Sequence, residues 1–400
     1  MLVITAPGQG AQAPGFLTPW LDVPGFAGRL AAWSELAGID LMRCGTTADT
    51  DEIRDTAVAQ PLLDAAAIAA AEALFGGLDQ AQAQLGAVAG HSVGELAAGA
   101  IAGVLSPEDA IRLVRVRGQA MARAAAEQPT GMTAVLGGDE AAVLDAIEAY
   151  GLTPANVNGS GQIVAAGTLE QLEKFAANPP AGARLRPLQV AGAFHTRHMA
   201  PAVDALRQAA ATVTISDPAI LLLSNRDGCA VRSGADWLER IITQVSAPVR
   251  WNLCLREMAR LGVSGFIELP PAGTLTGLAR RALPGVAVTG LKTPSDLAAA
   301  RTLLGEHGAV DPYLGGQAPE WRLLVAPLAG TFRTVAGDTE PVAAGAMVPT
   351  GAEIGHVEQR GGRHAITPPF PATVIEWLVE DGDPVSAGQP LIRLQPDQAG

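Results

Sequence analysis

The stretch LGAVAGHSVGELAAGA, residues 85–100, decides the fold class of this chain. It starts with an apolar run typical of a strand, passes through G-x-S-x-G at residues 90–94, and ends in an Ala-rich helical pattern. A sharp turn of this kind lifts the hydroxyl of Ser92 out of the sheet and brings the next backbone N–H near a developing oxyanion. An ordinary glycine turn would give the same letters, because the chain has 46 glycines. The sequence on both sides of the motif is therefore needed to distinguish a nucleophilic serine from an ordinary turn.

The chain on both sides of this motif alternates short apolar runs with helical stretches. LVITAPGQ at 2–9 predicts the first strand, and Gln60-Pro61 predicts a helix start. The pattern returns with AILLLSN at 219–225 and GFIELP at 265–270. Continuous apolar strands between helices indicate a parallel sheet that is covered on both faces. We therefore expect an α/β core formed by residues 1–125 and 192–295.

Two further regions have other rhythms. Residues 126–191 predict strand–helix–strand–strand–helix–strand, which is the order of a ferredoxin-like βαββαβ insert. Residues 296–320 are rich in Gly and Pro and predict a linker. Residues 321–400 contain short strands with turn signals about every 8–12 residues, which predicts a small all-β domain of barrel or sandwich type.

Composition excludes several classes of protein. With 48% hydrophobic and 17% charged residues, the chain is not disordered. The net charge of −13 argues against nucleic acid as a partner. No uninterrupted apolar run approaches the roughly 20 residues of a membrane span, and MLVITAPGQG lacks the basic region of a signal peptide. We therefore expect a cytoplasmic protein with no membrane partner.

The cysteines and histidines predict no metal centre. The three cysteines lie far apart in the sequence, which excludes a disulfide framework and a CxxC zinc site. The six histidines show no HExxH or similar metal-ligand spacing.

A serine nucleophile needs a base, and the sequence offers more than one. His195 and His198 both lie in AGAFHTRHMAP, and their spacing does not choose between them. Either could instead be a polar histidine without a catalytic role. His91, next to the serine, is expected to point elsewhere on a sharp turn. PGQG at 7–10 either supplies a second oxyanion N–H or is merely a turn.

Seven motifs, in order over roughly residues 1–295, resemble malonyl-CoA:acyl carrier protein transacylases and the related acyltransferase domains of polyketide synthases. They are APGQGAQ, Gln60-Pro61-Leu62, GHSVGELAAG, LVRVRGQAM, NVNGSGQIVAAG, GAFHTRHMAPA and QVSAPVRW. The resemblance implies an α/β-hydrolase-like core with a ferredoxin-like insert. It also implies ping-pong transfer of malonyl from malonyl-CoA to the phosphopantetheine thiol of acyl carrier protein, for fatty acid or polyketide synthesis.

The resemblance assigns roles to individual residues. Ser92 matches the nucleophile, and His195 matches the catalytic base because the H-x-x-x-M-x-P spacing fits it and not His198. The backbone N–H groups of Gln9 and Val93 match the oxyanion hole.

Further matches surround this pair. Gln244 matches the residue whose main-chain carbonyl orients the histidine, and Gln60 and Asn158 match supporting positions near the site. Arg117 matches the arginine that binds the malonyl carboxylate, a charge that acetyl lacks. A partly buried pair of this kind contributes about 1.5–3 kcal/mol. Without the resemblance, Arg117 would be a surface helical arginine paired with an acid such as Asp109.

The resemblance extends to acyl-group choice. Phe194, immediately before the histidine, accompanies malonyl specificity, and Val93 replaces the Gln common in methylmalonyl enzymes. A phenyl ring that fills the space of an α-methyl group excludes it by overpacking.

Residues 321–395 resemble a biotinyl/lipoyl carrier domain. Such domains present a lysine on a hairpin, and here Gly361 stands at that position. No lysine follows Lys292, so an amide link to biotin or lipoate cannot form in this region, and we expect no cofactor. The region is either a docking or dimerising module or a remnant of gene fusion.

Two other functions remain as alternatives. A serine esterase of the α/β-hydrolase type would place its histidine near the chain end after an acid and would have no use for Arg117. A non-enzymatic protein would use the carrier-like region and keep the N-terminal part as a scaffold. The absent lysine counts against that alternative.

Overall fold

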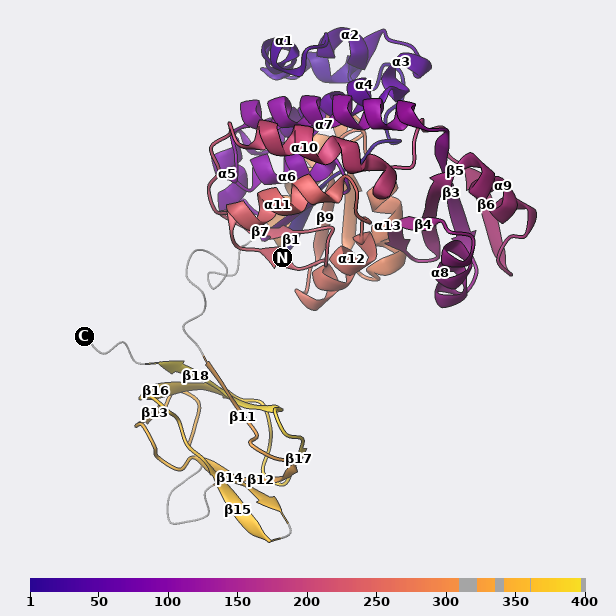
Figure 1. Cartoon of the computed structure of the whole chain (residues 1–400). Helices are drawn as coiled ribbons and strands as arrows, with labels where there is room; N and C mark the ends of the chain where they lie inside the picture. Colours follow the sequence, from indigo (N-terminus) through magenta and orange to yellow (C-terminus); the bar gives the residue numbers. More distant parts are fainter. Residues whose placement is uncertain (309–321, 335–341, 360, 397–400) are drawn as a thin grey trace. The chain divides into compact units, whose positions relative to one another are not determined.

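The computed structural model describes residues 1–308, 322–334, 342–359 and 361–396 (Figure 1). The chain divides into two compact units, Met1–Gly315 and Gly316–Gly400.

A six-stranded sheet forms the centre of the first unit. Its order is β10-β9-β1-β2-β7-β8, and all neighbouring strands are parallel except the β7–β8 pair. The strands are β1 (Leu2–Ala6), β2 (Ala87–Gly90), β7 (Leu221–Leu223), β8 (Ala230–Val231), β9 (Gly265–Glu268) and β10 (Ala287–Gly290). The predicted α/β class with a parallel sheet is confirmed.

Helices cover both faces of this sheet, as the apolar strands predict. Leu2 and Ile4 point into a core shared with most helices, whereas Val3 points into a second core beneath the opposite face. That second core packs against α12 (Trp251–Arg260) and α13 (Thr274–Ala282). The larger core packs against α1 (Phe26–Ala37), α2 (Leu41–Thr46), α3 (Thr50–Arg54), α4 (Thr56–Phe75), α5 (Leu78–Gln84), α6 (Gly94–Ile101), α7 (Pro107–Glu127), α10 (Ala200–Ala210) and α11 (Gly234–Gln244). Short 3-10 turns occupy Thr18–Asp22 and Arg197–Met199.

Helix α4 begins earlier than Gln60-Pro61 predicts. Asp55 is its N-cap, and its carboxylate accepts a hydrogen bond from the backbone N–H of Ala57. Pro61 therefore lies inside the helix. By length and composition α4 is the one helix in the described residues that could cross a membrane, but 83% of its apolar window is buried in the protein, as expected for a core helix.

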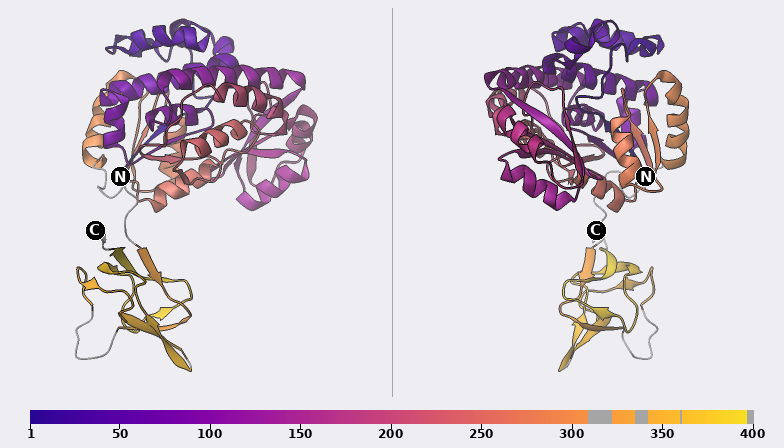
Figure 2. Two further views of the ribbon diagram at one scale, coloured as in Figure 1. Left: turned by 60° about the vertical axis from the view of Figure 1, so that its left-hand side comes forward. Right: turned by 90° about the vertical axis from the view of Figure 1, so that its right-hand side faces the viewer.

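A four-stranded antiparallel sheet is inserted between α7 and α10. Its order is β4-β5-β3-β6, and it has a small core of its own around Val135, Ile147 and Phe175. The elements are β3 (Thr130–Gly137), α8 (Glu140–Ala149), β4 (Thr153–Gly159), β5 (Gln162–Thr168), α9 (Leu169–Ala177) and β6 (Ala183–Pro187). Figures 1 and 2 show this subdomain at one side of the core. Val249 joins the two, because its N–H and C=O bond to Ala155 and Val157 of β4, both at 2.9 Å.

The predicted linker at 296–320 is wrong in its first part. Pro294–Asp296 forms a 3-10 turn with a capping box from Thr293, and Leu297–His307 forms α14. Leu297, Ala300 and Leu303 are buried in the larger core. The Ala-rich pattern at 297–304 is helical, but the Gly- and Pro-rich sequence that follows obscures it. Residues 309–320 lie outside the described residues.

The second unit contains two antiparallel sheets of four strands, β11-β18-β16-β13 and β15-β14-β12-β17. Phe332, Val357 and Leu394 are fully buried in its core. The strands are β11 (Arg322–Val325), β12 (Gly330–Thr334), β13 (Met347–Val348), β14 (Gly355–Gln359), β15 (Gly362–Ile366), β16 (Ala372–Trp377), β17 (Pro384–Val385) and β18 (Pro390–Pro396). Gly361, with φ of +115°, lies in the turn between β14 and β15.

Candidate active site

Ser92 occupies a sharp turn between β2 and α6. Its φ is +54°, in the left-handed region that non-glycine residues rarely adopt. Close packing requires both glycines of the motif: a Cβ on Gly90 would lie 2.0 Å from Gly94, and a Cβ on Gly94 would lie 2.4 Å from the carbonyl oxygen of Ala6. The motif therefore forms a tight turn that presents the side chain of Ser92.

Ser92 faces His195. The distance from Ser92 Oγ to His195 Nε2 is 2.7 Å, and His195 Nδ1 lies 2.9 Å from the main-chain carbonyl oxygen of Gln244. Because a carbonyl only accepts, Nδ1 carries the hydrogen and the Nε2 lone pair faces the serine. Burial, followed by the charge of Arg117, lowers the pKa of His195 to about 3. His198 lies half-buried on the next turn, so of the two candidates the structure brings His195 to Ser92.

Arg117 projects from α7 to the same place. It is 1% exposed, and its two terminal nitrogens donate to the side-chain oxygens of Gln60 at 2.7 Å and Gln244 at 2.8 Å. One of these nitrogens lies 3.4 Å from Ser92 Oγ. Burial lowers the pKa of Arg117 to about 10, which still leaves a cation at neutral pH. Asp64, one turn after Gln60 on α4, is fully buried, and burial raises its pKa well above its usual value.

Two backbone N–H groups are available for an oxyanion. Gln9 lies in the turn after β1, where its side chain donates to the carbonyl oxygen of Arg54 at 3.3 Å and to Thr56 Oγ1 at 3.2 Å. Val93 precedes the first turn of α6. Within the described part of the chain, neither backbone N–H has an intramolecular acceptor. A helix N-terminus and a free N–H both favour developing negative charge.

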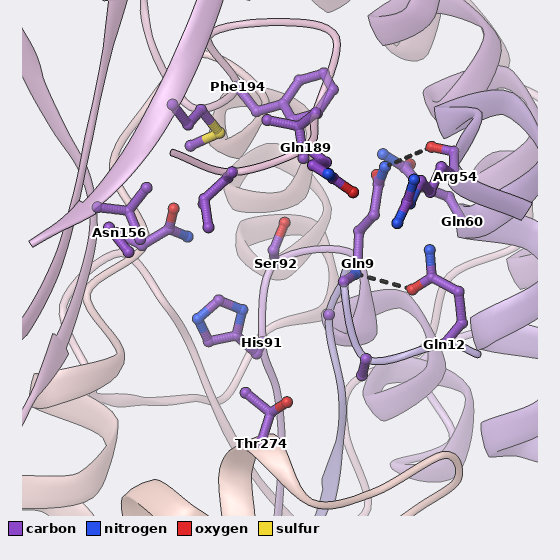
Figure 3. A pocket seen from close by; sticks show the side chains of 18 of the residues that line it. Gln9, Gln12, Arg54, Gln60, His91, Ser92, Asn156, Gln189, Phe194 and Thr274 are labelled. Carbon is purple, nitrogen blue, oxygen red and sulfur yellow. Dashed lines mark hydrogen bonds between the residues drawn. The ribbon is translucent and has the colours of Figure 1, made fainter. Parts of the chain in front are cut away.

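A cavity of about 680 Å³ opens onto Ser92. Figure 3 shows Asn156 on one side of the serine, Gln9, Gln60 and Arg54 on the opposite side, and Phe194 above it in this view. Its lining is mostly neutral, and Arg54 is the one arginine or lysine among the described residues that line it. A cavity of this size can hold a small organic molecule.

Asn158 lines the cavity and contacts a neighbour there. Its Oδ1 lies 2.8 Å from Nε2 of His91, and the His91 ring packs edge-on against Trp251 with centroids 5.6 Å apart. His91 lines the cavity, but its ring nitrogen contacts Asn158 and not Ser92.

Sequence reasoning missed two residues beneath the serine turn. Asn225 accepts from the backbone N–H of Ser92 at 2.7 Å and donates to the carbonyl oxygen of Gly90 at 2.7 Å. Glu95 is 1% exposed and accepts from the backbone N–H of Asn225 at 2.8 Å and from Nε2 of Gln244. Burial raises the pKa of Glu95 to about 8. Asn225 follows strand β7 at the carboxyl edge of the sheet, where sites in such folds form, and this was the available signal.

No group of three or more His, Cys, Asp or Glu side chains that could hold a metal ion occurs among the described residues.

Comparison with known proteins matches this chain to one family. The family model for the acyl transferase domain matches residues 5–298. The malonyl CoA-acyl carrier protein transacylase of Mycobacterium bovis is 53% identical over 297 residues, which cover 74% of this chain and 98% of that protein. The crystal structure of MCAT from Mycobacterium tuberculosis superposes with a TM-score of 0.72 at 52% identity, over 74% of this chain and 98% of that one.

A further solved structure is a malonyl-transacylase in complex with a type II polyketide synthase acyl-carrier protein. It matches with a TM-score of 0.69 at 29% identity, over 76% of this chain and 99% of that chain. This chain therefore belongs to the malonyl-CoA:acyl carrier protein transacylase family of acyltransferases.

Proposed function

We propose that this acyltransferase moves a malonyl group from malonyl-CoA to the phosphopantetheine thiol of an acyl carrier protein, for fatty acid or polyketide synthesis. The observation that carries the proposal is the hydrogen-bonded chain from Ser92 Oγ through His195 to the Gln244 carbonyl, with the Arg117 cation beside it. The family's activity and the complex of a relative with its carrier protein support the same reaction.

In the first half-reaction, Ser92 Oγ attacks the thioester carbonyl while His195 Nε2 accepts the serine proton. The carbonyl oxygen becomes an oxyanion, which the N–H groups of Gln9 and Val93 stabilise. When the tetrahedral intermediate collapses, the carbon–sulfur bond breaks and coenzyme A leaves as a thiol with the proton from His195. A malonyl-Ser92 ester remains.

The second half-reaction runs the same steps in reverse with another thiol. His195 Nε2 takes the proton of the phosphopantetheine thiol, and the thiolate attacks the ester carbonyl. The proton then returns to Ser92 Oγ as the new thioester is released. The Gln244 carbonyl keeps His195 in the required tautomer through both halves.

Arg117 and Phe194 set the acyl group. Arg117 is held by neutral amide oxygens, which leaves its positive charge available for the malonyl carboxylate. Phe194 is 6% exposed and lines the cavity, where its ring limits the space for an α-methyl group. Gln60 and Asn158 support this arrangement through Arg117 and His91 respectively.

We also infer the finer classification of the fold. The first unit is α/β-hydrolase-like, and its insert is ferredoxin-like, supported by the antiparallel order β4-β5-β3-β6. The second unit is a biotinyl/lipoyl-like domain without a modifiable lysine, supported by Gly361 in the β14–β15 turn. Protein produced together with biotin and lipoate ligases is then expected to show no added mass. The enzyme is cytoplasmic, which cell fractionation tests.

Incubation with malonyl-CoA, followed by intact mass and peptide mapping, tests the proposed reaction. We expect one malonyl group on the peptide that contains Ser92, and transfer of that group to added holo acyl carrier protein. Ser92→Ala is the matched control, because it removes only the hydroxyl. A malonyl adduct on the Ser92→Ala variant, or none on the wild type, contradicts the proposal.

A further inference from the structure

Glu95 is a buried acid that none of these transfer steps uses. It is the second residue of α6, three positions after Ser92, and it is 1% exposed. Both of its carboxylate oxygens accept hydrogen bonds. One accepts from the backbone N–H of Asn225 at 2.8 Å, and the other accepts from Nε2 of Gln244. Burying a carboxylate costs free energy, so the buried position of Glu95 beneath the nucleophile needs an explanation.

The side chain of Gln244 explains this position, because the oxygen and nitrogen of its amide face different partners. Its Oε1 accepts from Arg117 at 2.8 Å, while its Nε2 donates to Glu95 and to the main-chain oxygen of Ser92 at 3.2 Å. If the amide were reversed, its N–H groups would face the N–H groups of Arg117. An ionised carboxylate accepts and cannot donate, so it selects the amide orientation that gives Arg117 an acceptor.

We propose that Glu95 is a positioning residue that fixes the orientation of the Gln244 amide and thereby aims Arg117 at the carboxylate of the acyl group. Glu95 acts through Gln244 and does not contact the substrate. The inference rests on the proposed role of Arg117.

The proton on Glu95 is coupled to this arrangement. A protonated carboxyl group needs an acceptor, and Gln244 Oε1 could serve only by turning away from Arg117. Burial raises the pKa of Glu95 to about 8, against the charges of Arg117 on α7 and Arg240 on α11. The Cys254 thiol on α12 also interacts electrostatically with this carboxyl and stays neutral, because burial raises its own pKa. Ionised Glu95, and with it the preference for malonyl, therefore increases as the pH rises from 7 to 9.

Glu95→Gln tests the inference with almost no change of shape. The backbone N–H of Asn225 needs an acceptor, so the new amide keeps its oxygen there and directs its N–H end at Gln244. Gln244 then has to turn its own oxygen toward residue 95 and away from Arg117. We expect the ratio of kcat/KM for malonyl-CoA over acetyl-CoA to fall about tenfold, while acetyl transfer changes by less than about threefold. We also expect the wild-type ratio to rise between pH 7 and 9 and the variant's ratio to stay flat.

Glu268→Gln is the matched control. Glu268 is fully buried and accepts from the backbone N–H groups of Gly273, Leu275 and Thr276 at 2.7–2.9 Å, away from Arg117. This variant should lower Tm and leave the ratio unchanged. If Glu95→Gln does not fold by circular dichroism, Glu95→Asp replaces it, because a shorter carboxylate cannot reach both partners and should also lower the ratio.

Arg117→Ala separates this inference from the proposed function. A lost ratio in Arg117→Ala with an unchanged ratio and an unchanged pH slope in Glu95→Gln overturns the role of Glu95 and leaves that of Arg117. An unchanged ratio in Arg117→Ala overturns both.

Discussion

The two units of the chain treat buried polar groups in different ways. In the first unit, buried polar side chains from distant elements converge under Ser92, among them Arg117, His195 and Gln244. In the described part of the second unit, His356 is the one buried polar side chain, and the core is aliphatic and aromatic. A buried polar group costs free energy unless hydrogen bonds compensate for it. Such groups therefore concentrate in the first unit, where the proposed transfer takes place.

The largest effect is expected from the removal of the general base, His195. His195→Ala should slow acylation of Ser92 by about 10²–10⁴-fold, because the serine proton then has no acceptor. His198→Ala is the control, since that residue lies half-buried on the following turn. Single-turnover acylation by malonyl-CoA measures both. Equal damage from the two variants would show that the base is misassigned.

Arg117→Ala should discriminate between acyl groups. The malonyl carboxylate would enter the site unpaired, a penalty of roughly 2–4 kcal/mol in kcat/KM, whereas acetyl loses nothing comparable. Arg117→Lys should recover part of the loss, because it restores the charge but not the planar pair of donors. An unchanged ratio of malonyl to acetyl specificity constants would remove Arg117 from the acyl site.

Phe194→Ser should relax the enzyme toward methylmalonyl-CoA. The phenyl ring occupies part of the cavity next to His195, and inserting a methyl group into filled space costs about 1–3 kcal/mol, or about tenfold to a hundredfold in preference. Competition between malonyl-CoA and methylmalonyl-CoA measures the change. Equal use of the two substrates by the wild type would mean that Phe194 does not set the choice.

The sequence predicted the parts of this unit that local patterns encode. The motif around Ser92, the parallel strands and the strand–helix order of the insert follow from spacing and periodicity within short windows. Asn225 and Glu95 could not be found in this way, because their contact joins residues 130 positions apart. Helix α14 was missed for another reason: its buried residues Leu297 and Leu303 stand in a short Ala-rich segment directly before a Gly- and Pro-rich one. Tertiary packing decides such cases.

The depressed pKa of His195 makes a prediction about pH. With a pKa of about 3, the histidine stays neutral from pH 7 down to pH 5, so single-turnover acylation should change by less than about threefold over that range. The free energy of unfolding, unlike the acylation rate, should change with pH. Below pH 6.5 the unfolded histidine binds a proton that the folded one refuses, so this contribution to the free energy of unfolding declines as the pH falls from 6.5 toward 3.

His195→Gln is the control for this prediction, because a glutamine does not titrate. The drop in Tm between pH 7 and pH 5 should be smaller in this variant than in the wild type. An acylation rate that falls with an apparent pKa near 6.5 would show that His195 titrates like an exposed histidine.

The smallest effect expected is the removal of the second unit. Every residue assigned a role in the transfer lies before residue 250, and in the sequence the first compact unit ends at Gly315. A chain that ends at Gly315 should therefore keep malonyl transfer to free acyl carrier protein within about threefold, because separate cores fold and act separately.

A chain that ends at Thr293 is the contrasting variant. It loses α14, and with it the buried side chains of Leu297 and Leu303, each of which contributes about 1.5–3 kcal/mol by burial. That shorter chain should show a clearly lower Tm, which places the end of the catalytic unit after α14. The prediction is contradicted if the chain ending at Gly315 folds by circular dichroism and acylates Ser92 but no longer transfers malonyl to the carrier protein. The second unit would then take part in docking the carrier protein.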